Sequence, residues 1–307
     1  MRSTLTIGSR GSKLALTQTN QVADMIREAI PGIEVDIQII LTKGDRILDK
    51  PLAEIGGKGL FTEELEAALR DGSIDLAVHS LKDLPTDNPK GLIIAASPTR
   101  GIPNDALVCT KYASLKDLPA GATVGTSSLR RKAQLLALNP ALKIVDIRGN
   151  IDTRMGKVIE TGELDAVILA CAGLHRIDRA DAIAEVIAPD LMLPAASQGV
   201  LGIQTRADDT ELIEALSSIH DPNTHAEATA ERTLLAGLGG GCQVPIGALA
   251  KVEDGVLTMD GCVCSLDGTT TLRTTVSGPS DNAEDLGKQA AEDLLSQGAV
   301  AIIEEIG

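Results

Sequence analysis

Short apolar runs of strand length alternate with longer segments of helical periodicity in the first part of the chain. The pattern predicts strands at 4–10, 33–41 and 74–80 and helices at 12–30 and 60–70. The first helix begins at Ser12, a good N-cap residue, and is stopped by Pro31 and Gly32. Alternation of this kind is typical of an α/β fold with a largely parallel sheet.

Part of this pattern occurs twice. Segment 6–16 (TIGSRGSKLAL) is similar to 123–133 (TVGTSSLRRKA), and segment 72–84 is similar to 162–174. Asp75 and Asp165 fall at matched positions of the second pair. Two weak matches in the same order predict two lobes of similar build, and chance similarity between βαβ units is the alternative.

The boundary between the two lobes is predicted from composition. Two prolines and a glycine in 97–105 mark the end of the first lobe. After Pro194, an apolar strand at 199–206 is expected to return to the first lobe as a second crossing. Two crossings would leave a cleft between the lobes, and small ligands commonly bind at such junctions.

From residue 221 the pattern changes to that of a small α+β domain. A helix to about 236 precedes strands at 244–252, 256–265 and 269–277 and a helix at 281–297. Asp254-Gly255 and Asp267-Gly268 are hairpin signals between the strands. We therefore expect three domains, formed by 1–98 with 194–218, by 99–193 and by 219–307.

The composition limits the classes of partner. Aromatic residues make up 1% and hydrophobic residues 43% of the 307 residues, so the core must be aliphatic. The net charge of −15 and the lack of stacking aromatics argue against nucleic acid and anionic lipid. We find no signal peptide and no apolar stretch long enough to span a membrane, and we expect a cytoplasmic protein.

The cysteines give no sign of a disulfide framework or a zinc site. There are five of them, an odd number, and no C-x-x-C motif occurs. Cys262 and Cys264 alternate along a predicted strand, so they share a face and are expected to pack in the core. The four histidines are scattered, and no metal is expected.

Positive charge is concentrated in one segment of this acidic chain. Residues 126–154 contain six Lys or Arg and two Asp. Arg130 and Arg131 fall in the first turn of a predicted helix, where cations oppose the helix dipole. They are explained if an anion binds there, held also by the hydroxyls of Thr126 and Ser128.

Other basic residues follow predicted strands. Arg148 and Arg176 come after apolar strands, Arg154 lies one turn into a helix, and Arg10 occupies the matching corner of the first lobe beside Ser12. This is the edge at which open α/β sheets bind ligands, although surface salt bridges are the alternative. The expected ligand is small and carries several carboxylates or phosphates.

Known nucleotide motifs do not fit. The sequence GGKG at 56–59 departs from a P-loop, and no G-x-G-x-x-G follows a strand. Segment 42–59 is long, polar and glycine-rich and is followed by Phe61, which predicts a lid or, alternatively, a disordered loop without function.

Two residues are candidates for the chemistry. Asp83, beside Lys82, ends the strand 74–80 and could act as an acid or base, or the two could form an ion pair that fixes the turn. Cys242 follows three glycines in GLGGGCQVPIG (237–247). Glycines let a backbone pass close to a bulky group, so this loop is either a flexible linker or an attachment point.

Six motifs occur in an order that resembles the porphobilinogen deaminase (hydroxymethylbilane synthase) family over nearly the whole chain. They are IGSRGSKLAL, GGKGLFTEELE, DLAVHSLKDLP, GTSSLRRKAQL, RGNIDTR and GGGCQVPIG. The resemblance implies two lobes like those of transferrins and periplasmic binding proteins, joined by hinge strands, and a small C-terminal α+β domain.

The resemblance also implies the activity. A dipyrromethane cofactor is joined to Cys242 by a thioether, and four porphobilinogen molecules are condensed onto it with loss of ammonia. Water then releases hydroxymethylbilane, the linear tetrapyrrole of haem biosynthesis. The enzyme would be a monomeric transferase with porphobilinogen and linear pyrrole intermediates as its partners.

Residue roles follow from the matched motifs. Asp83 corresponds to the catalytic acid. The implied lid residues are Gly57, Lys58, Gly59 and Phe61. The residues implied to bind cofactor and substrate are Arg10, Ser12, Ser80, Lys82, Thr126, Ser128, Arg130, Arg131, Arg148, Asn150, Arg154, Arg176 and Gln198.

Three positions depart from the family pattern. Segment 102–106 lacks an arginine often found there, Ser197 stands where glycine is usual, and His175 replaces a basic residue. Two other functions remain open at this point. One is a non-catalytic anion-binding receptor, which needs the arginines but neither Asp83 nor a loaded cysteine. The other is an acyl- or phosphate-transfer enzyme with Cys242 as nucleophile.

Overall fold

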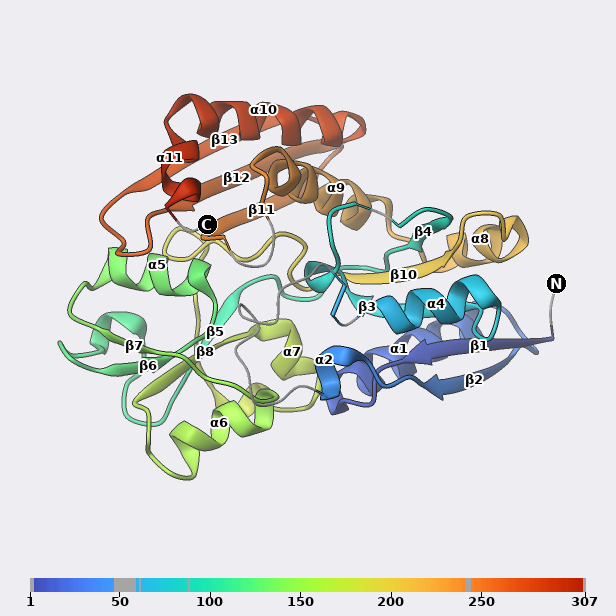
Figure 1. Cartoon of the computed structure of the whole chain (residues 1–307), viewed down its shortest axis with the longest axis horizontal. Helices are drawn as coiled ribbons and strands as arrows, with labels where there is room; N and C mark the ends of the chain where they lie inside the picture. The colour runs from blue at the N-terminus through green and yellow to red at the C-terminus, as the bar shows by residue number, and fades with distance from the viewer. Residues whose placement is uncertain (1–2, 47–58, 61, 88, 241–243, 306–307) are drawn as a thin grey trace. The chain divides into compact units, whose positions relative to one another are not determined.

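The computed structural model describes residues 3–46, 59–60, 62–87, 89–240 and 244–305. The chain divides into two compact units (Figure 1). The first unit is Met1–Arg100 with Val200–His225, and the second unit is Gly101–Gly199 with Ala226–Gly307. Among the described helices, none combines the length and the apolar character that crossing a membrane would require.

The first unit contains a five-stranded sheet in the order β2-β1-β3-β10-β4. Its strands are β1 (Thr4–Ser9), β2 (Glu34–Ile39), β3 (Leu76–Ser80), β4 (Leu92–Ala96) and β10 (Leu201–Arg206). β1 is parallel to β2 and β3, whereas β10 is antiparallel to β3 and β4. The sheet is therefore mixed rather than largely parallel, because the returning strand runs against both neighbours.

Helices cover both faces of this sheet. They are α1 (Lys13–Ala29), α4 (Glu63–Asp71) and α8 (Thr210–Leu216), and a short helix, α2 (Lys43–Arg46), follows β2. Val22 and Ile26 of α1 share one cluster with Leu212 of α8, while Leu65 and Leu69 of α4 form another. As predicted, α1 begins at Ser12, whose hydroxyl accepts a hydrogen bond from the backbone N–H of Ala15.

The second unit repeats this arrangement in the order β7-β6-β8-β5-β9. Its strands are β5 (Asp105–Cys109), β6 (Thr123–Gly125), β7 (Lys143–Val145), β8 (Ala166–Ala170) and β9 (Ile183–Val186), and its helices are α5 (Leu129–Leu138), α6 (Ile151–Ile159) and α7 (Cys171–Arg176). β6 is parallel to β7 and β8, and β5 is antiparallel to β8 and β9. The two sheets therefore have the same strand order and the same directions.

The matched aspartates make matched hydrogen bonds. Asp75 accepts from the backbone N–H of Thr6 at 2.8 Å, and Asp165 accepts from that of Thr123 at 2.9 Å. Each bond fixes the start of one parallel strand against the next. The internal repeat inferred from two weak sequence matches is confirmed.

A three-stranded antiparallel sheet in the order β11-β12-β13 completes the second unit. It consists of β11 (Ile246–Glu253), β12 (Val256–Cys264) and β13 (Thr271–Pro279), with α9 (Pro222–Gly237), α10 (Ala283–Ser296) and the unforeseen α11 (Ala299–Glu304). Leu234, Met259 and Leu294 are fully buried between sheet and helices. Cys262 and Cys264 are buried on one face of β12, as predicted.

The two hairpin turns differ. Asp254 and Gly255 form the predicted tight turn with positive φ at both residues. The next turn is longer, because the Asp267 carboxylate accepts hydrogen bonds from the Ser265 hydroxyl and the Thr269 backbone N–H. β13 therefore begins two residues later than the predicted strand at 269–277.

The second turn packs on helix α5. Gly268 has φ +75°, and a Cβ there would lie 2.3 Å from the backbone nitrogen of Ala137. Only glycine permits this approach of the C-terminal sheet to α5. The C-terminal domain thus packs on the second lobe within one unit, while the proposed division into three domains stays a prediction.

Ser197 combines strain with burial. It has φ +60°, is fully buried, and its hydroxyl finds no partner in the part of the chain that the structure describes. Its backbone N–H donates to the Glu231 carboxylate at 2.5 Å, which holds the strained conformation. A left-handed backbone and an unsatisfied buried hydroxyl each cost free energy.

We expect Ser197→Gly to stabilise the protein by about 1 kcal/mol, because glycine adopts positive φ freely and carries no hydroxyl. The measurement is the urea midpoint of unfolding. Ser197→Ala is the matched control, since it removes the hydroxyl but keeps the Cβ, and it should recover only part of the gain. A lower midpoint for Ser197→Gly than for the unmodified chain would show that the hydroxyl is needed.

Candidate functional site

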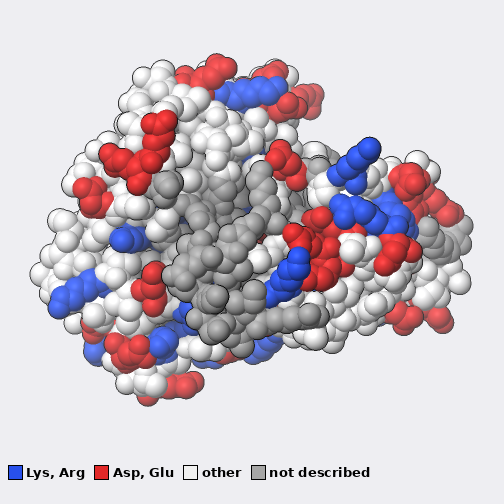
Figure 2. Space-filling view, in the orientation of Figure 1, with Lys and Arg blue, Asp and Glu red and all other residues white. Residues whose placement is uncertain are grey.

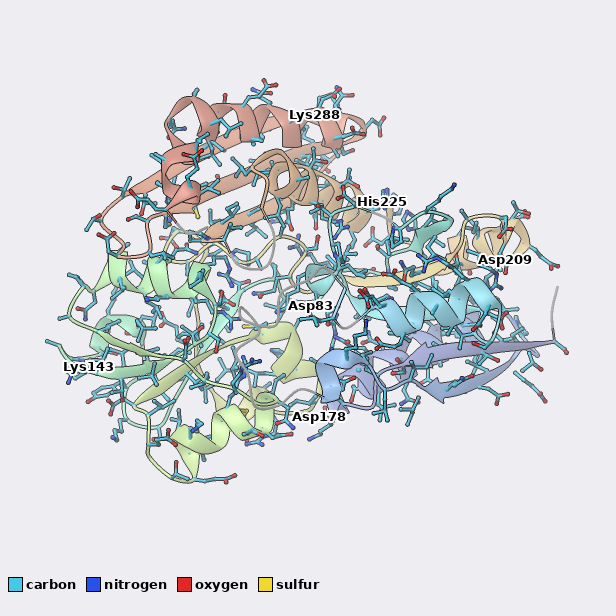
Figure 3. The ribbon with its side chains drawn as sticks, in the orientation of Figure 1. Asp83, Lys143, Asp178, Asp209, His225 and Lys288 are labelled. Carbon is cyan, nitrogen blue, oxygen red and sulfur yellow. The ribbon has the colours of Figure 1, made fainter. Side chains whose placement is uncertain are left out.

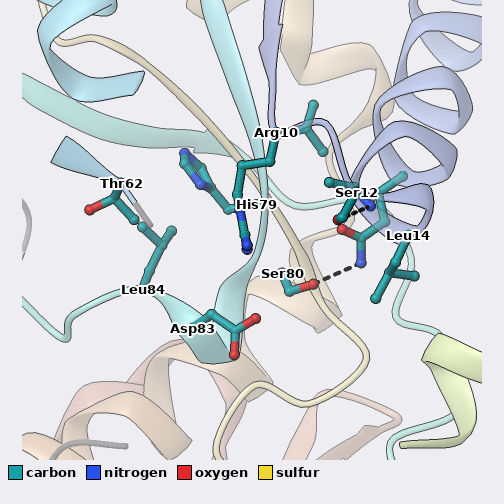
Figure 4. Close-up of a pocket in the computed structure, with 11 residues that line it drawn as sticks. Arg10, Ser12, Leu14, Thr62, His79, Ser80, Asp83 and Leu84 are labelled. Carbon is teal, nitrogen blue, oxygen red and sulfur yellow. Dashed lines mark hydrogen bonds between the residues drawn. The ribbon is translucent and has the colours of Figure 1, made fainter. Parts of the chain in front are cut away.

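An open hollow lies in the first unit, at the carboxyl ends of β1 and β3 and the start of α1 (Figure 4). Its volume is about 450 Å³, counted out to bulk solvent. The lining residues are Arg10, Ser12, Leu14, Ala15, Gln18, Thr62, Val78, His79, Ser80, Asp83 and Leu84. Four of them, Arg10, Ser12, Ser80 and Asp83, were predicted from the sequence.

The end of β3 places the predicted carboxylate. The strand stops at Ser80 and continues into the single 3-10 turn η1 (Leu81–Asp83), so Asp83 follows the strand directly (Figure 3). Asp83 is exposed and Lys82 is half-buried. Lys82 shares the turn but is not among the described residues that line the hollow.

Arg10 is oriented by a carboxylate that the sequence analysis missed. Its Nη2 lies 2.5 Å from Oδ1 of Asp45, and its Nε also donates to this carboxylate. Burial raises the pKa of Asp45, but hydrogen bonds from Arg10 and Thr42 outweigh burial and hold the pKa below its ordinary value. Asp45 therefore stays charged and fixes the guanidinium of Arg10 at the hollow.

Two further polar residues of the hollow were also missed. Gln18 is buried, and its amide nitrogen donates to the Ser80 hydroxyl at 2.7 Å. His79 is buried, and its Nε2 lies 3.1 Å from Oε1 of Gln204 on β10. A glutamine on the buried face of a helix is an available sequence signal, because buried amides need partners.

The imidazole of His79 is neutral at neutral pH. Burial lowers its pKa to about 4, and the nearby charge of Arg10 acts in the same direction, while the Gln204 hydrogen bond opposes them. With Gln204 Oε1 as acceptor, the proton lies on Nε2. His79 therefore fixes β3 against β10 without adding charge.

In the second unit, three predicted binding residues lie at helix starts. Ser128 caps α5 by accepting from the Arg131 backbone N–H, and Thr126 accepts from the backbone N–H of Ser128. Asn150 caps α6 by accepting from the Thr153 N–H at 2.8 Å. These side chains shape the corners at which the basic residues begin.

Arg130 and Arg131 share a buried carboxylate that the sequence analysis did not single out. Their side chains are 5% and 8% exposed, and that of Asp105 is 0% exposed. Arg130 Nη1 and Arg131 Nη2 each lie 2.7 Å from Asp105. Gln198 also donates to Asp105, at 2.9 Å. Burial raises the pKa of Asp105, but the two arginines outweigh burial and keep the carboxyl ionised.

The remaining predicted arginines lie in the segments that come after strands β7 and β8. Arg148 comes after β7, Arg154 donates from Nε to the Gly149 carbonyl at 2.8 Å, and Arg176 ends α7. Arg176 donates to the Gly199 carbonyl at 2.7 Å, and burial lowers its pKa to about 10, so it remains a cation at neutral pH. Among the described residues on the face seen in Figure 2, basic and acidic side chains are interspersed.

Several predicted residues lie outside the described part of the chain. They are Gly57, Lys58, Phe61 and Cys242. The fourth lid residue, Gly59, is described and has φ +93°. Its carbonyl accepts from the backbone N–H groups of Thr62 and Glu63 at the start of α4.

Comparisons with known proteins define the class first. Residues 5–214 match the family model "Porphobilinogen deaminase, dipyromethane cofactor binding domain", and residues 225–296 match "Porphobilinogen deaminase, C-terminal domain". The chain is thus an enzyme that carries a dipyrromethane cofactor. It belongs to the porphobilinogen deaminase family.

Relatives agree over almost the full length. Porphobilinogen deaminase of Maridesulfovibrio salexigens is 50% identical over 302 residues, which is 98% of each chain. That of Staphylococcus carnosus is 48% identical over 304 residues, again 98% of each chain. Among solved structures, the periplasmic VFT2 domain of Bordetella pertussis BvgS is 17% identical with a TM-score of 0.42, over 71% of this chain and 86% of that one.

The activity follows from the family. The enzyme joins porphobilinogen molecules onto its dipyrromethane cofactor with loss of ammonia and releases hydroxymethylbilane, in porphyrin biosynthesis. The family matches confirm the family, the transferase activity and the cofactor that the sequence predicted. The two α/β lobes and the C-terminal sheet confirm the predicted fold class. The alternatives of a non-catalytic receptor and of an acyl- or phosphate-transfer enzyme are excluded.

His79 should make the protein sensitive to acid. The unfolded chain takes up this proton near pH 6.5 and the folded chain only near pH 4, so stability falls as the pH drops through that range, by at most about 3 kcal/mol. His79→Gln keeps a donor near the Nε2 position without titrating, and its urea midpoint should fall less between pH 6.5 and 4.5.

The exposed His175 provides the control. His175→Gln should keep the full acid sensitivity of the unmodified chain. Equal sensitivity of the His79→Gln variant and the unmodified chain would contradict a neutral, buried imidazole.

Proposed function

We propose that Asp83 is the catalytic acid and base of the condensation and that Cys242 carries the dipyrromethane through a thioether. The support for Asp83 is its place in the hollow, directly after β3 and together with Arg10 and Ser80. The support for Cys242 is its position in the glycine loop 237–247, which matches the family motif.

The proposed chemistry uses one carboxyl group. Protonated Asp83 gives its proton to the amine of porphobilinogen, the C–N bond breaks, and ammonia leaves. The resulting carboxylate stabilises the cationic methylene-pyrrolenine while the next pyrrole α-carbon forms the C–C bond. The proton lost from that α-carbon returns to Asp83, so the residue is restored after each addition. Water finally releases the product.

The cofactor supplies the pyrrole α-carbon at which the first porphobilinogen is joined. Each pyrrole carries an acetate and a propionate, so the ligand is a polyanion. The donor set fits such a group, because Arg10 follows β1 and lines the hollow, while the second unit holds the buried cation Arg130 and the half-buried cation Arg176. In this proposal the carboxylates are also bound by Ser12, Ser80, Lys82, Thr126, Ser128, Arg148, Asn150 and Arg154. Arg131 and Gln198 belong to the same set through Asp105, to which both donate hydrogen bonds.

We further infer that the enzyme acts in the cytoplasm as a monomer on free porphobilinogen, with neither nucleic acid nor membrane as partner. The net charge of −15 supports the absence of nucleic-acid and membrane partners, because it disfavours binding to polyanionic surfaces. Segment 42–59, with Gly57, Lys58, Gly59 and the nearby Phe61, is proposed as the lid.

Replacing the attachment residue should remove the cofactor mass. Cys242→Ser should have the mass of its sequence alone, whereas the unmodified chain should be heavier by one dipyrromethane in intact-mass spectrometry. Cys109→Ser is the matched control and should keep the added mass, because Cys109 is a partly exposed thiol at another place in the fold. Retention of the mass by Cys242→Ser would place the thioether elsewhere.

Replacing the carboxyl group should separate cofactor loading from turnover. Asp83→Asn should keep the cofactor mass but lower kcat by roughly 10²–10⁴-fold, the range for loss of a general acid or base. Asp208→Asn, at an exposed position of the same unit, should keep normal kcat. An unchanged kcat for Asp83→Asn would remove this residue from the mechanism.

A further inference from the structure

The neighbouring arginines of α5 use their N–H groups differently. Arg131 donates from both Nε and Nη2 to Oδ1 of Asp105, at 3.1 and 2.7 Å, and from Nη1 to the Ile168 carbonyl at 2.9 Å. The side of the guanidinium that usually grips a carboxylate is therefore already occupied by the protein. Arg131 is fixed to β5 and β8.

Arg130 keeps that side available. Its Nη1 donates to Oδ2 of Asp105 at 2.7 Å and to the Leu193 carbonyl at 2.6 Å. Its Nε and Nη2 have no partner among the residues for which the structure gives positions. Nε and Nη2 form the planar fork that matches the two oxygens of a carboxylate.

Asp105 also receives Gln198. Gln198 Nε2 donates to Oδ1 of Asp105 at 2.9 Å and to the Pro103 carbonyl at 2.7 Å. Asp105 therefore accepts four hydrogen bonds with one carboxylate, three at Oδ1 and one at Oδ2. So many donors on a fully buried carboxylate fix both guanidinium planes.

The charges of this cluster do not cancel. Two guanidinium groups and one carboxylate leave one positive charge at a site with almost no solvent exposure. Cys171 adds no charge, because burial raises its pKa to about 11. A buried excess charge is costly, and one ligand carboxylate on the open fork of Arg130 would balance it.

We propose that Asp105 is a positioning residue that binds Arg131 to the fold and holds the Nε–Nη2 fork of Arg130 ready for a single pyrrole carboxylate. The identity of that ligand rests on the proposed function; the division of roles between the two arginines does not. Arg130 is then the ligand-binding member of the pair, and Arg131 serves through Asp105.

Lysine substitutions separate the two roles, because lysine keeps the charge but loses the fork. Arg131→Lys should lower the melting temperature more than Arg130→Lys. Porphobilinogen should raise the melting temperature of a Cys242→Ser chain, which has no tether. When Arg130→Lys is added to this chain, at least tenfold more porphobilinogen should be needed for the same rise in melting temperature. When Arg131→Lys is added instead, the required concentration should increase less.

Asp105→Asn tests the positioning role. If Asp105 acts through Arg130, the double variant Asp105→Asn/Arg130→Lys should require no more porphobilinogen than Arg130→Lys alone. If Asp105 had a purely structural role, the fold-increases in required porphobilinogen caused by Asp105→Asn and by Arg130→Lys would multiply in the double variant. Asp165→Asn is the matched control and should lower only the melting temperature. Asp165 precedes β8 and accepts hydrogen bonds from Thr123, whereas Asp105 pairs with Ala170 at the other end of β8.

Two results would overturn the proposal. One is an equal loss of porphobilinogen binding in Arg130→Lys and Arg131→Lys, and the other is multiplying effects in the double variant. Failure of the proposed tether would instead be seen in the mass of Cys242→Ser, which none of these melting experiments uses as its readout.

Discussion

In each unit, carboxylates hold arginine side chains in place. A protein of net charge −15 cannot attract a polyanion by its overall charge, so it must present positive charge locally. Arg10 is oriented by Asp45, and Arg130 and Arg131 by Asp105. Each carboxylate lowers the local positive charge, but it also removes the freedom of a long side chain, and low solvent exposure makes the remaining charge more effective.

The repeated framework separates scaffold from chemistry. The backbone N–H groups of Thr6 and Thr123 donate to Asp75 and Asp165, which fixes the amino ends of β3 and β8 in the same way. At the carboxyl ends of these two strands the sequences diverge. Three residues after the end of β3 stands Asp83, whereas three residues after the end of β8 stands Gly173. The carboxyl end of β8 therefore has no carboxyl group at the position that corresponds to Asp83.

Local signals were predictable because they need only neighbouring residues. Ser12 and Ser128 cap the helices they precede, and Asp254-Gly255 forms the expected turn. The edge at which the arginines lie followed from their positions after predicted strands. The antiparallel direction of β10 did not, because periodicity carries no information on the direction in which a returning strand enters a sheet.

The partners of the site residues were missed for the same physical reason. Asp45 lies 35 positions from Arg10, and Gln18 lies 62 positions from Ser80. Asp105 opens an apolar strand 25 positions before Arg130. Contacts across such separations depend on the completed fold, and a single sequence gives no pairing information. The family resemblance supplied the proposed binding residues but not the carboxylates to which Arg10, Arg130 and Arg131 donate.

Helix α5 shows how the position of one guanidinium depends on distant packing. Its start is fixed by Asp105, and its middle by Gln134, whose amide both donates to and accepts from the backbone of Leu193. Its last turn is held by Gly268, where the C-terminal sheet approaches within contact of the helix backbone. A Cβ at Gly268 would meet backbone atoms of Leu136 and Ala137, so a side chain there is incompatible with the packing of the C-terminal sheet on α5. The C-terminal sheet therefore supports the helix that carries Arg130, although it supplies none of the hydrogen bonds that the structure gives to this guanidinium.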